Sequence, residues 1–156
     1  MVDVPRGRSD GSGYVTSEPL PTVLVVDDEA DNLATFRRVF RGEYKLTLAA
    51  SAAEAREHLA KRSYDVVFSD YAMPSENGVS LLDYVKDNHP ETQRFLVTAY
   101  ADLPEVRSAA DTGVVSAIIL KPWDRDVVAR WVAHGQRLAK MRRGVAKMSR
   151  ATDPKE

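Results

Sequence analysis

The chain has 156 residues, enough for one domain with terminal tails, and its 22 basic and 23 acidic residues give a formal net charge of −1. This balance provides no general attraction to nucleic acid or to a membrane surface, and the absence of cysteine excludes disulfides, thiolate metal sites and cysteine nucleophiles. Because no apolar run approaches membrane-spanning length and no secretory signal is visible, we expect a cytoplasmic protein with no membrane partner.

Residues 1–21 are rich in Gly, Ser, Pro and charge and have no periodicity, which predicts a disordered leader. Five apolar runs then alternate with helical patterns. The runs predict strands at 22–26, 44–48, 65–69, 94–98 and 114–120. Helices are expected before Gly42, after a capping box at Ser51 and Glu54, at 78–88, at 103–112, and from about Asp124 onward.

This alternation predicts the fold class. Strands that are continuously apolar, rather than alternating, are typical of a parallel sheet covered by helices on both faces. Right-handed crossovers leave few topologies, of which a doubly wound five-stranded sheet is the simplest. We therefore expect an α/β protein.

Polar side chains follow four of the five predicted strands. Asp27 and Asp28 follow the first, Asp70 the third, Thr98 the fourth and Lys121 the fifth. The ends of parallel strands share one edge of a sheet, so these side chains can converge. Two carboxylates about 4 Å apart repel by roughly 4 kcal/mol at an effective dielectric near 20. Three acids therefore need a proton, a lysine or a cation, and oxygen ligands of this kind suit Mg²⁺.

The chain resembles the receiver domain of two-component response regulators over about 22–137. This resemblance implies the flavodoxin-like strand order 2-1-3-4-5 and leaves 138–156 as a basic helical extension or tail. The residues that carry it are Asp27 and Asp28, Asp70 with Met73, Pro74 and Gly78, Thr98 with Ala99, and Lys121 with Pro122.

The resemblance also implies a mechanism. Asp70 would accept a phosphoryl group from a histidine kinase or a histidine phosphotransfer protein. Asp27, Asp28, Asp70 and the backbone carbonyl of Ala72 would bind Mg²⁺, while Thr98 and Lys121 would contact phosphoryl oxygens. Such a domain catalyses its own phosphorylation and dephosphorylation but is not otherwise an enzyme. The altered charge would change the face made by the fourth helix, fifth strand and last helix, for a protein partner or an output domain.

Three positions depart from the family pattern. Ile118 occupies the place of the usual switch aromatic, three residues before the lysine. Ala72 and Tyr100 occupy the positions that tune loss of the phosphoryl group, and neither side chain positions a water as an amide or carboxylate would. We therefore expect a long-lived phosphorylated state.

The last helix carries an apolar series at alternating spacings of three and four, the seam pattern of a coiled coil. Its basic end, from Arg137 to Arg150, contains no acid. The series indicates either a closing helix with a frayed tail or a stalk that forms a homodimer or leads to a partner. No recognition helix accompanies the basic run, so nucleic acid is not an expected partner. The series comprises Trp131, His134, Leu138, Met141, Val145 and Met148.

Two other functions stay open. A receiver-like interaction module would keep the fold without phosphorylation, although the complete acid set argues against it. A hydrolase with an aspartate nucleophile would favour a second acid two residues after Asp70, where this chain has Ala72. Taken singly, Asp70 would be interpreted as a helix cap, so the phosphoacceptor hypothesis depends on the whole set.

Overall fold

A computed structural model describes residues 19–152. Most of the predicted leader, residues 1–18, and the last part of the predicted tail, residues 153–156, lie outside the described residues. The strands are β1 (Thr22–Val26), β2 (Lys45–Ala49), β3 (Val66–Asp70), β4 (Gln93–Thr98) and β5 (Ala117–Leu120). The helices are α1 (Ala30–Phe40), α2 (Ala52–Lys61), α3 (Gly78–Asn88), α4 (Pro104–Asp111) and α5 (Arg125–Thr152). Each predicted strand and helix is present.

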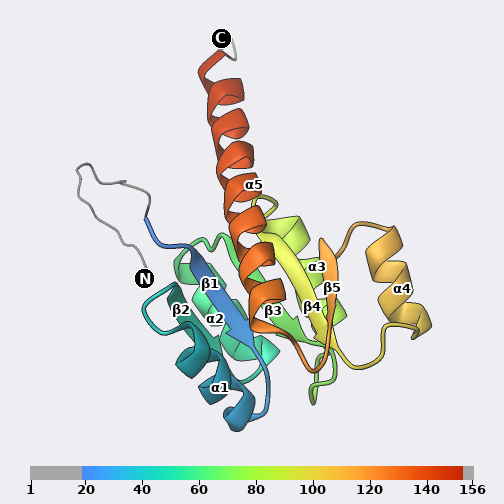
Figure 1. Ribbon diagram of the computed structural model, residues 1–156. Helices are drawn as coiled ribbons and strands as arrows, with labels where there is room; N and C mark the ends of the chain where they lie inside the picture. Colours follow the sequence, from blue (N-terminus) through green and yellow to red (C-terminus); the bar gives the residue numbers. More distant parts are fainter. Residues whose placement is uncertain (1–18, 153–156) are drawn as a thin grey trace.

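The five strands form one sheet in the order β2-β1-β3-β4-β5, and every neighbouring pair is parallel. The predicted fold class and strand order are therefore confirmed. All strands run in the same direction, so their carboxyl ends lie together at the lower edge of the sheet in Figure 1.

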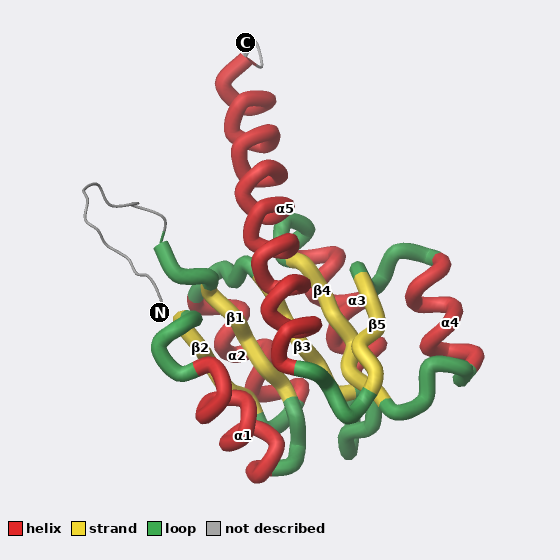
Figure 2. Tube along the Cα trace, in the orientation of Figure 1, coloured by secondary structure: helices red, strands yellow, loops and turns green. Residues whose placement is uncertain are grey.

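Helices cover both faces of the sheet (Figure 2). Val23 and Val25 point to the face covered by α1 and α5, whereas Leu24 and Val26 point to the face covered by α2, α3 and α4. Alternate strand residues face opposite sides, so a strand buried on both faces needs apolar residues at every position. This is why β1 is an uninterrupted apolar run.

The second helix begins at the predicted capping box. The Ser51 hydroxyl accepts a hydrogen bond from the Glu54 amide at 3.0 Å, and the Glu54 carboxylate accepts one from the Ala50 amide at 2.7 Å. These bonds satisfy backbone donors that a helix start leaves without intrahelical partners.

The fifth strand begins three residues later than the apolar pattern predicts. Its ordered part is Ala117–Leu120, while the amides of Val114 and Val115 both donate to the Ala109 carbonyl and close the end of α4. Valine favours strands, but the backbone amides of these two residues form hydrogen bonds that cap the end of α4 and are not available to the sheet. The other strand boundaries lie within one residue of the prediction.

The last helix extends well past the sheet, at the edge opposite the carboxyl ends of the strands (Figure 1). Near that edge the Arg143 guanidinium donates to the Asp65 carboxylate at 2.8 Å, and Arg142 donates to the Pro90 carbonyl at 3.2 Å. The helix is continuous over 28 residues, so the predicted boundary between the receiver domain and its extension, at residues 137 and 138, lies within it. Among residues 19–152, no helix combines the length and the apolar character needed to cross a membrane.

Candidate functional site

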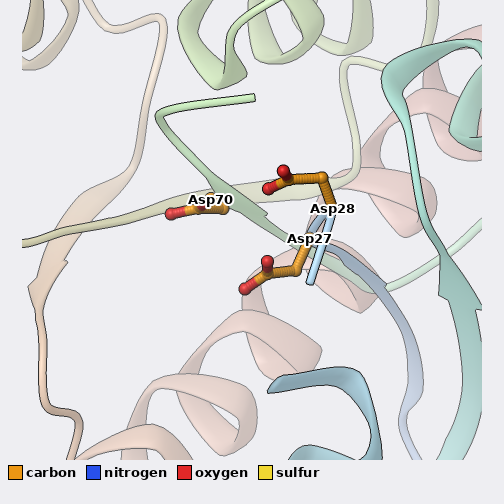
Figure 3. A group of neighbouring side chains, drawn as sticks. All are labelled: Asp27, Asp28 and Asp70. Atoms are coloured by element: carbon orange, nitrogen blue, oxygen red, sulfur yellow. The ribbon is translucent and has the colours of Figure 1, made fainter. Parts of the chain in front are cut away.

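Three carboxylates meet at the carboxyl edge of the sheet (Figure 3). Asp27 and Asp28 directly follow β1, and Asp70 is the last residue of the neighbouring strand β3. One ligand oxygen from each lies within 4.8 Å of the others. Asp27 and Asp70 are buried, whereas Asp28 is exposed. The structure thus brings together the three acids that the sequence selects.

Local hydrogen bonds orient Asp27. Its carboxylate accepts from the Glu29 amide at 2.9 Å and from the Asn32 side-chain amide at 3.1 Å. Both donors come from the start of α1, so the first turn of that helix holds one of the three carboxylates in place. Asn32 is a site neighbour that the sequence analysis does not identify, because its role depends on how α1 turns back over β1.

A lysine neutralises part of this acidic cluster. The Lys121 ammonium lies 2.8 Å from a carboxylate oxygen of Asp70, and the Lys121–Pro122 peptide bond is cis. Burial raises the pKa of Asp70, while the hydrogen bond from Lys121 opposes that rise. Burial by itself would lower the pKa of Lys121, but the contact with Asp70 outweighs it and raises that pKa. The pair is therefore best described as an ammonium–carboxylate ion pair.

The remaining predicted residues lie on both sides of Asp70. Thr98 is the buried last residue of β4, the strand next to β3. Its hydroxyl oxygen accepts a hydrogen bond from the Tyr100 amide at 2.9 Å. The Lys121 amide donates to the Thr98 carbonyl at 3.0 Å, which joins the ends of β4 and β5. Ala72 is exposed in the loop between β3 and α3, two residues after Asp70.

Gly78 permits a close approach behind the phosphoacceptor candidate. A Cβ atom at this position would collide with the carbonyl group of Asp70 and lie 2.8 Å from a methyl carbon of Leu96. The Gly78 amide donates to the Tyr71 carbonyl at 2.9 Å. The glycine therefore starts α3 directly against the end of β3 and closes the loop that contains Ala72.

Side chains on both sides of this loop tie it to neighbouring helices. The Tyr71 hydroxyl donates to the Glu105 carboxylate of α4 at 2.7 Å, and the Asn77 side-chain amide donates to the same carboxylate at 3.3 Å. On the other side, the Arg56 guanidinium of α2 pairs with Glu76 at 2.5 Å. The sequence alone does not indicate these contacts, because their partners are 20 to 34 residues apart and no local motif links them.

The donor set suits a hard cation. Mg²⁺ takes oxygen ligands, usually from one or more carboxylates, with waters filling several of the other positions, and this cluster offers three carboxylates. Cysteine is absent from the chain, so a soft metal would find no thiolate ligand here. The residues present at this edge therefore fit the predicted magnesium site.

A cavity of about 660 Å³ opens beside the acids, between α1 and the loop that precedes α5. Its polar end is formed by Asp27, Asp70 and Lys121, and its apolar wall includes Phe36 and Trp123. The rings of Phe36 and Trp123 lie 5.4 Å apart between centroids. Asp27 and Asp70 therefore line a recess with one charged end and one aromatic wall.

Comparisons with known proteins agree with this geometry. The family model described as the response regulator receiver domain matches residues 23–133. The chain is 34% identical over 110 residues to the hydrogenase transcriptional regulatory protein HoxA of Cupriavidus necator, covering 70% of this chain and 23% of that protein. It is also 34% identical over 119 residues to the DNA-binding transcriptional regulator NtrC of Escherichia coli K12, covering 73% of this chain and 25% of that protein.

Among solved structures, the signal receiver domain of an HD domain-containing protein from Pseudomonas fluorescens Pf-5 is similar, with a TM-score of 0.76 and 26% identity. That match covers 85% of this chain and 98% of the solved one. The chain spans about a quarter of the length of the two curated relatives. The extent of the family match, and the fold that accompanies it, show that the chain belongs to the response regulator receiver domain family.

Proposed function

We propose that this receiver domain is a phosphorylation-driven switch in which Asp70 accepts a phosphoryl group from a phosphohistidine donor. The observation that carries the proposal is the pairing of Asp70 with Lys121 at 2.8 Å, inside a cluster of three carboxylates. A lone buried carboxylate would serve equally well as a structural cap. A carboxylate that has both an ammonium partner and two further acids is suited to phosphoryl transfer, which depends on positioning and charge neutralisation.

In the proposed step, a carboxylate oxygen of Asp70 attacks the phosphorus atom of the donor. The new phosphorus–oxygen bond forms as the phosphorus–nitrogen bond breaks, and the protonated donor ring leaves as neutral imidazole. Lys121 binds one of the phosphoryl oxygens and Thr98 donates its hydroxyl hydrogen to another. Asp27, Asp28, Asp70 and the Ala72 carbonyl would hold Mg²⁺, which when bound would offset the negative charge of the phosphoryl oxygens.

The recess between α1 and the loop before α5 gives the donor a route to Asp70. A histidine side chain is narrow enough to enter a cavity of this size, and the aromatic wall supplies apolar contact for the protein segment around it. The donor would be a histidine kinase or a histidine phosphotransfer protein.

The output would follow from the added charge beside Thr98. When the Thr98 hydroxyl turns toward a phosphoryl oxygen, it gives up its bond to the Tyr100 amide, and the segment leading into α4 shifts. The face made by α4, β5 and α5 would then bind a protein partner or an output domain. Receiver domains are regulatory proteins in this respect, and the proposed chemistry is confined to Asp70 itself.

The exposed stripe on α5 supports a further contact surface. Met141, Val145 and Met148 are 62, 64 and 68% exposed and lie along one side of the helix beyond the sheet. We propose that this stripe pairs with the same stripe of a second copy, as the seam spacing predicts.

The proposal is tested by incubating the protein with Mg²⁺ and acetyl phosphate and measuring the intact mass. We expect a gain of one phosphoryl group that is lost in Asp70→Asn and kept in Asp31→Asn, which removes an exposed acid of α1 outside the cluster. No mass gain in the wild type would favour the interaction module. Steady phosphate release from unrelated esters would favour a hydrolase. After the donor is removed, we expect the added mass to persist, and its loss within seconds would contradict the long lifetime inferred from Ala72 and Tyr100.

Magnesium binding is measured separately, by unfolding with urea at constant ionic strength. A ligand present at about ten times its dissociation constant stabilises the native state by roughly 1.4 kcal/mol. We expect Mg²⁺ to stabilise the wild type in this way and Asp28→Asn to lose most of the effect, because Asp28 is an exposed member of the cluster. Asp31→Asn should respond as the wild type does, and an equal response in Asp28→Asn would contradict the proposed ligand set.

A further inference from the structure

The loop that follows the phosphoacceptor candidate is connected directly to α4. Tyr71 is the residue after Asp70, and its backbone amide donates to the Val97 carbonyl of β4 at 3.0 Å. Its side chain packs against the core cluster that contains Val106 of α4 and, at its border, Ile118. The Tyr71 hydroxyl then reaches the Glu105 carboxylate at 2.7 Å. A single side chain thus spans from the phosphoacceptor position to the first turn of α4.

A second residue of the same loop reaches the same carboxylate. The Asn77 side-chain amide lies 3.3 and 3.4 Å from the two carboxylate oxygens of Glu105. The carbonyl oxygen of that side chain caps α3 by accepting from the Ser80 amide at 2.9 Å. Glu105 therefore receives hydrogen bonds from both ends of the loop that contains Ala72.

The opposite side of the loop is held to α2 rather than to α4. Arg56 pairs with Glu76, and its guanidinium carbon also lies 4.1 Å above the Tyr84 ring. The Ser80 hydroxyl donates to Glu76 at 2.8 Å. This second set of contacts anchors the loop without touching α4. Among the described residues, the side-chain hydrogen bonds from the loop to α4 are those to Glu105.

Ile118 occupies the position of the usual switch aromatic. Its side chain has no hydroxyl, so it cannot form a hydrogen bond that changes when Thr98 moves. Tyr71 lies on the same side of the sheet, packed against the same cluster, and has the polar group that Ile118 lacks. We propose that Tyr71 and Asn77 transmit the state of the Asp70 site to α4 through their shared hydrogen bonds to Glu105. This inference rests on the proposed phosphoacceptor function and names the contacts by which that site is coupled to α4.

The physical basis of the coupling is that ligands at the site change the loop itself. The Ala72 carbonyl is proposed to bind the metal and lies between Tyr71 and Asn77, so an occupied site restrains the backbone on which both donors sit. Glu105 is in the first turn of α4, where a shift of the carboxylate is passed to the helix start. A two-state equilibrium of α4 is biased only by contacts that differ between the states, and in this proposal the hydrogen bonds to Glu105 are the contacts that differ.

The test uses the intact chain with Mg²⁺ and beryllofluoride, a mimic of the bound phosphoryl group. Binding is followed by the fluorine NMR signal of the bound complex, and the response of α4 by amide hydrogen exchange over 105–111. We expect a change in α4 exchange on binding in the wild type. The change should be smaller in Tyr71→Phe, which loses one hydrogen bond, and smallest in Glu105→Ala, which loses those from both donors. Without beryllofluoride, the amides at the start of α4 should exchange about fivefold faster in Tyr71→Phe than in the wild type, as expected for one lost hydrogen bond worth about 1 kcal/mol.

Glu76→Gln is the matched control, because it alters the same loop on the side that contacts α2. It should bind beryllofluoride and keep the wild-type response of α4. The coupling would be overturned if Tyr71→Phe and Glu105→Ala kept the full α4 response. It would also be overturned if Glu76→Gln lost that response, or if α4 did not respond in the wild type. Loss of beryllofluoride binding in the two α4-side variants would do the same, because their contacts would then serve the site itself. Absence of binding in the wild type would instead refute the phosphoacceptor function, and the coupling with it. Tyr71→Phe removes only a hydroxyl, so it keeps the test decisive even where Glu105→Ala fails to fold.

Discussion

At the scale of single residues, opposing charges decide the state of the site. Two carboxylates at the separation found in the cluster repel by roughly 3–4 kcal/mol at an effective dielectric near 20, and an ammonium at hydrogen-bonding distance attracts by roughly 6 kcal/mol. Lys121 can therefore offset one repulsion but not all three. This leaves the cluster with a residual negative charge that a divalent cation would neutralise. Burial first, and then the neighbouring carboxylates, keep the pKa of Asp70 raised despite its lysine partner.

The Arg56–Glu76 pair leads to a prediction about pH. The hydrogen bond from Arg56 lowers the pKa of Glu76 below its ordinary value of 4.5. As pH falls, the Glu76 carboxylate is protonated in the unfolded chain before it is protonated in the native state. The stabilisation from the pair is therefore fully present above pH 4.5 and is lost as pH falls through the lower pKa of Glu76 in the native state. Because the pair is partly exposed, it contributes roughly 0.5–1 kcal/mol.

We expect Glu76→Gln to flatten the acid side of the stability curve, measured by urea unfolding at a series of pH values. Glu57→Gln, which removes an exposed glutamate of α2, should leave the wild-type slope. Parallel curves for the wild type and Glu76→Gln would show that Arg56 does not hold Glu76 ionised.

Residues that can be predicted from the sequence differ from the others in what brings them together. Asp70 and Thr98 end their strands, while Asp27, Asp28 and Lys121 directly follow theirs. The parallel topology alone brings these strand ends together. Tyr71 and Glu105 meet only because of the packing of α4 against the β3–α3 loop, which depends on side-chain contacts across the fold. The sequence therefore predicts the site from its strands but not the contacts between the loops and helices around it.

At the scale of elements, α5 contains two glycines in contrasting surroundings. Gly135 is buried where the helix crosses the sheet, and a Cβ atom there would lie 2.8 Å from a methyl carbon of Val66 and 3.4 Å from Cβ of Gln93. Gly144 lies beyond the sheet, and a Cβ atom there would meet nothing within 4 Å. The first glycine sets the distance between helix and sheet, whereas the second only weakens the helix.

We expect Gly135→Ala to lower the free energy of unfolding by about 1–3 kcal/mol, the usual cost of overpacking, and Gly144→Ala to raise it by about 0.5–1 kcal/mol through helix propensity. Thermal unfolding of the two variants beside the wild type measures both shifts. Stabilisation by both substitutions would show that α5 can move away from Val66 at little cost.

Element boundaries follow the same division between local and distant causes. The apolar runs predict β1 and α3 to the residue, because their ends coincide with polar or capping residues. The start of β5 is misplaced because Val114 and Val115 have strand propensity, yet their amides bond to the Ala109 carbonyl of the preceding helix. Propensity is a weak guide where a helix end competes for the same backbone groups.

At the scale of the whole molecule, the candidate site and the end of α5 lie at opposite edges of the sheet (Figure 1). The buried side of α5, which includes Val128, Val132 and Ala139, packs on the sheet. The Arg143–Asp65 ion pair then holds the helix where it leaves the domain. Asp65 also accepts the Thr22 amide at 3.0 Å, so the same carboxylate joins the starts of β1 and β3 to the helix. Asp65 therefore fixes α5 to the edge of the sheet opposite the candidate site.

The projecting stripe predicts how self-association depends on salt. Arg137 and Arg142 flank the apolar seam, and the segment from Arg137 to Arg150 contains no acid. Two such helices side by side repel through their charges while their methionine and valine side chains attract. Raising the ionic strength from about 0.05 M to about 0.5 M shortens the screening length roughly threefold, which weakens only the repulsion. We therefore expect sedimentation to report a larger dimer fraction at high salt.

Variants separate the two contributions to this dimer. Val145→Ser removes apolar contact and should reduce the dimer fraction at every salt concentration, whereas Arg137→Gln removes repulsion and should increase the dimer fraction at low salt. The control is Arg130→Gln, an exposed charge on the same helix before the stripe, which should leave the dimer fraction close to that of the wild type. A dimer fraction that falls as salt rises would mean that opposite charges hold the copies together, and the α5 stripe, which has no acid to offer, could not then be the interface.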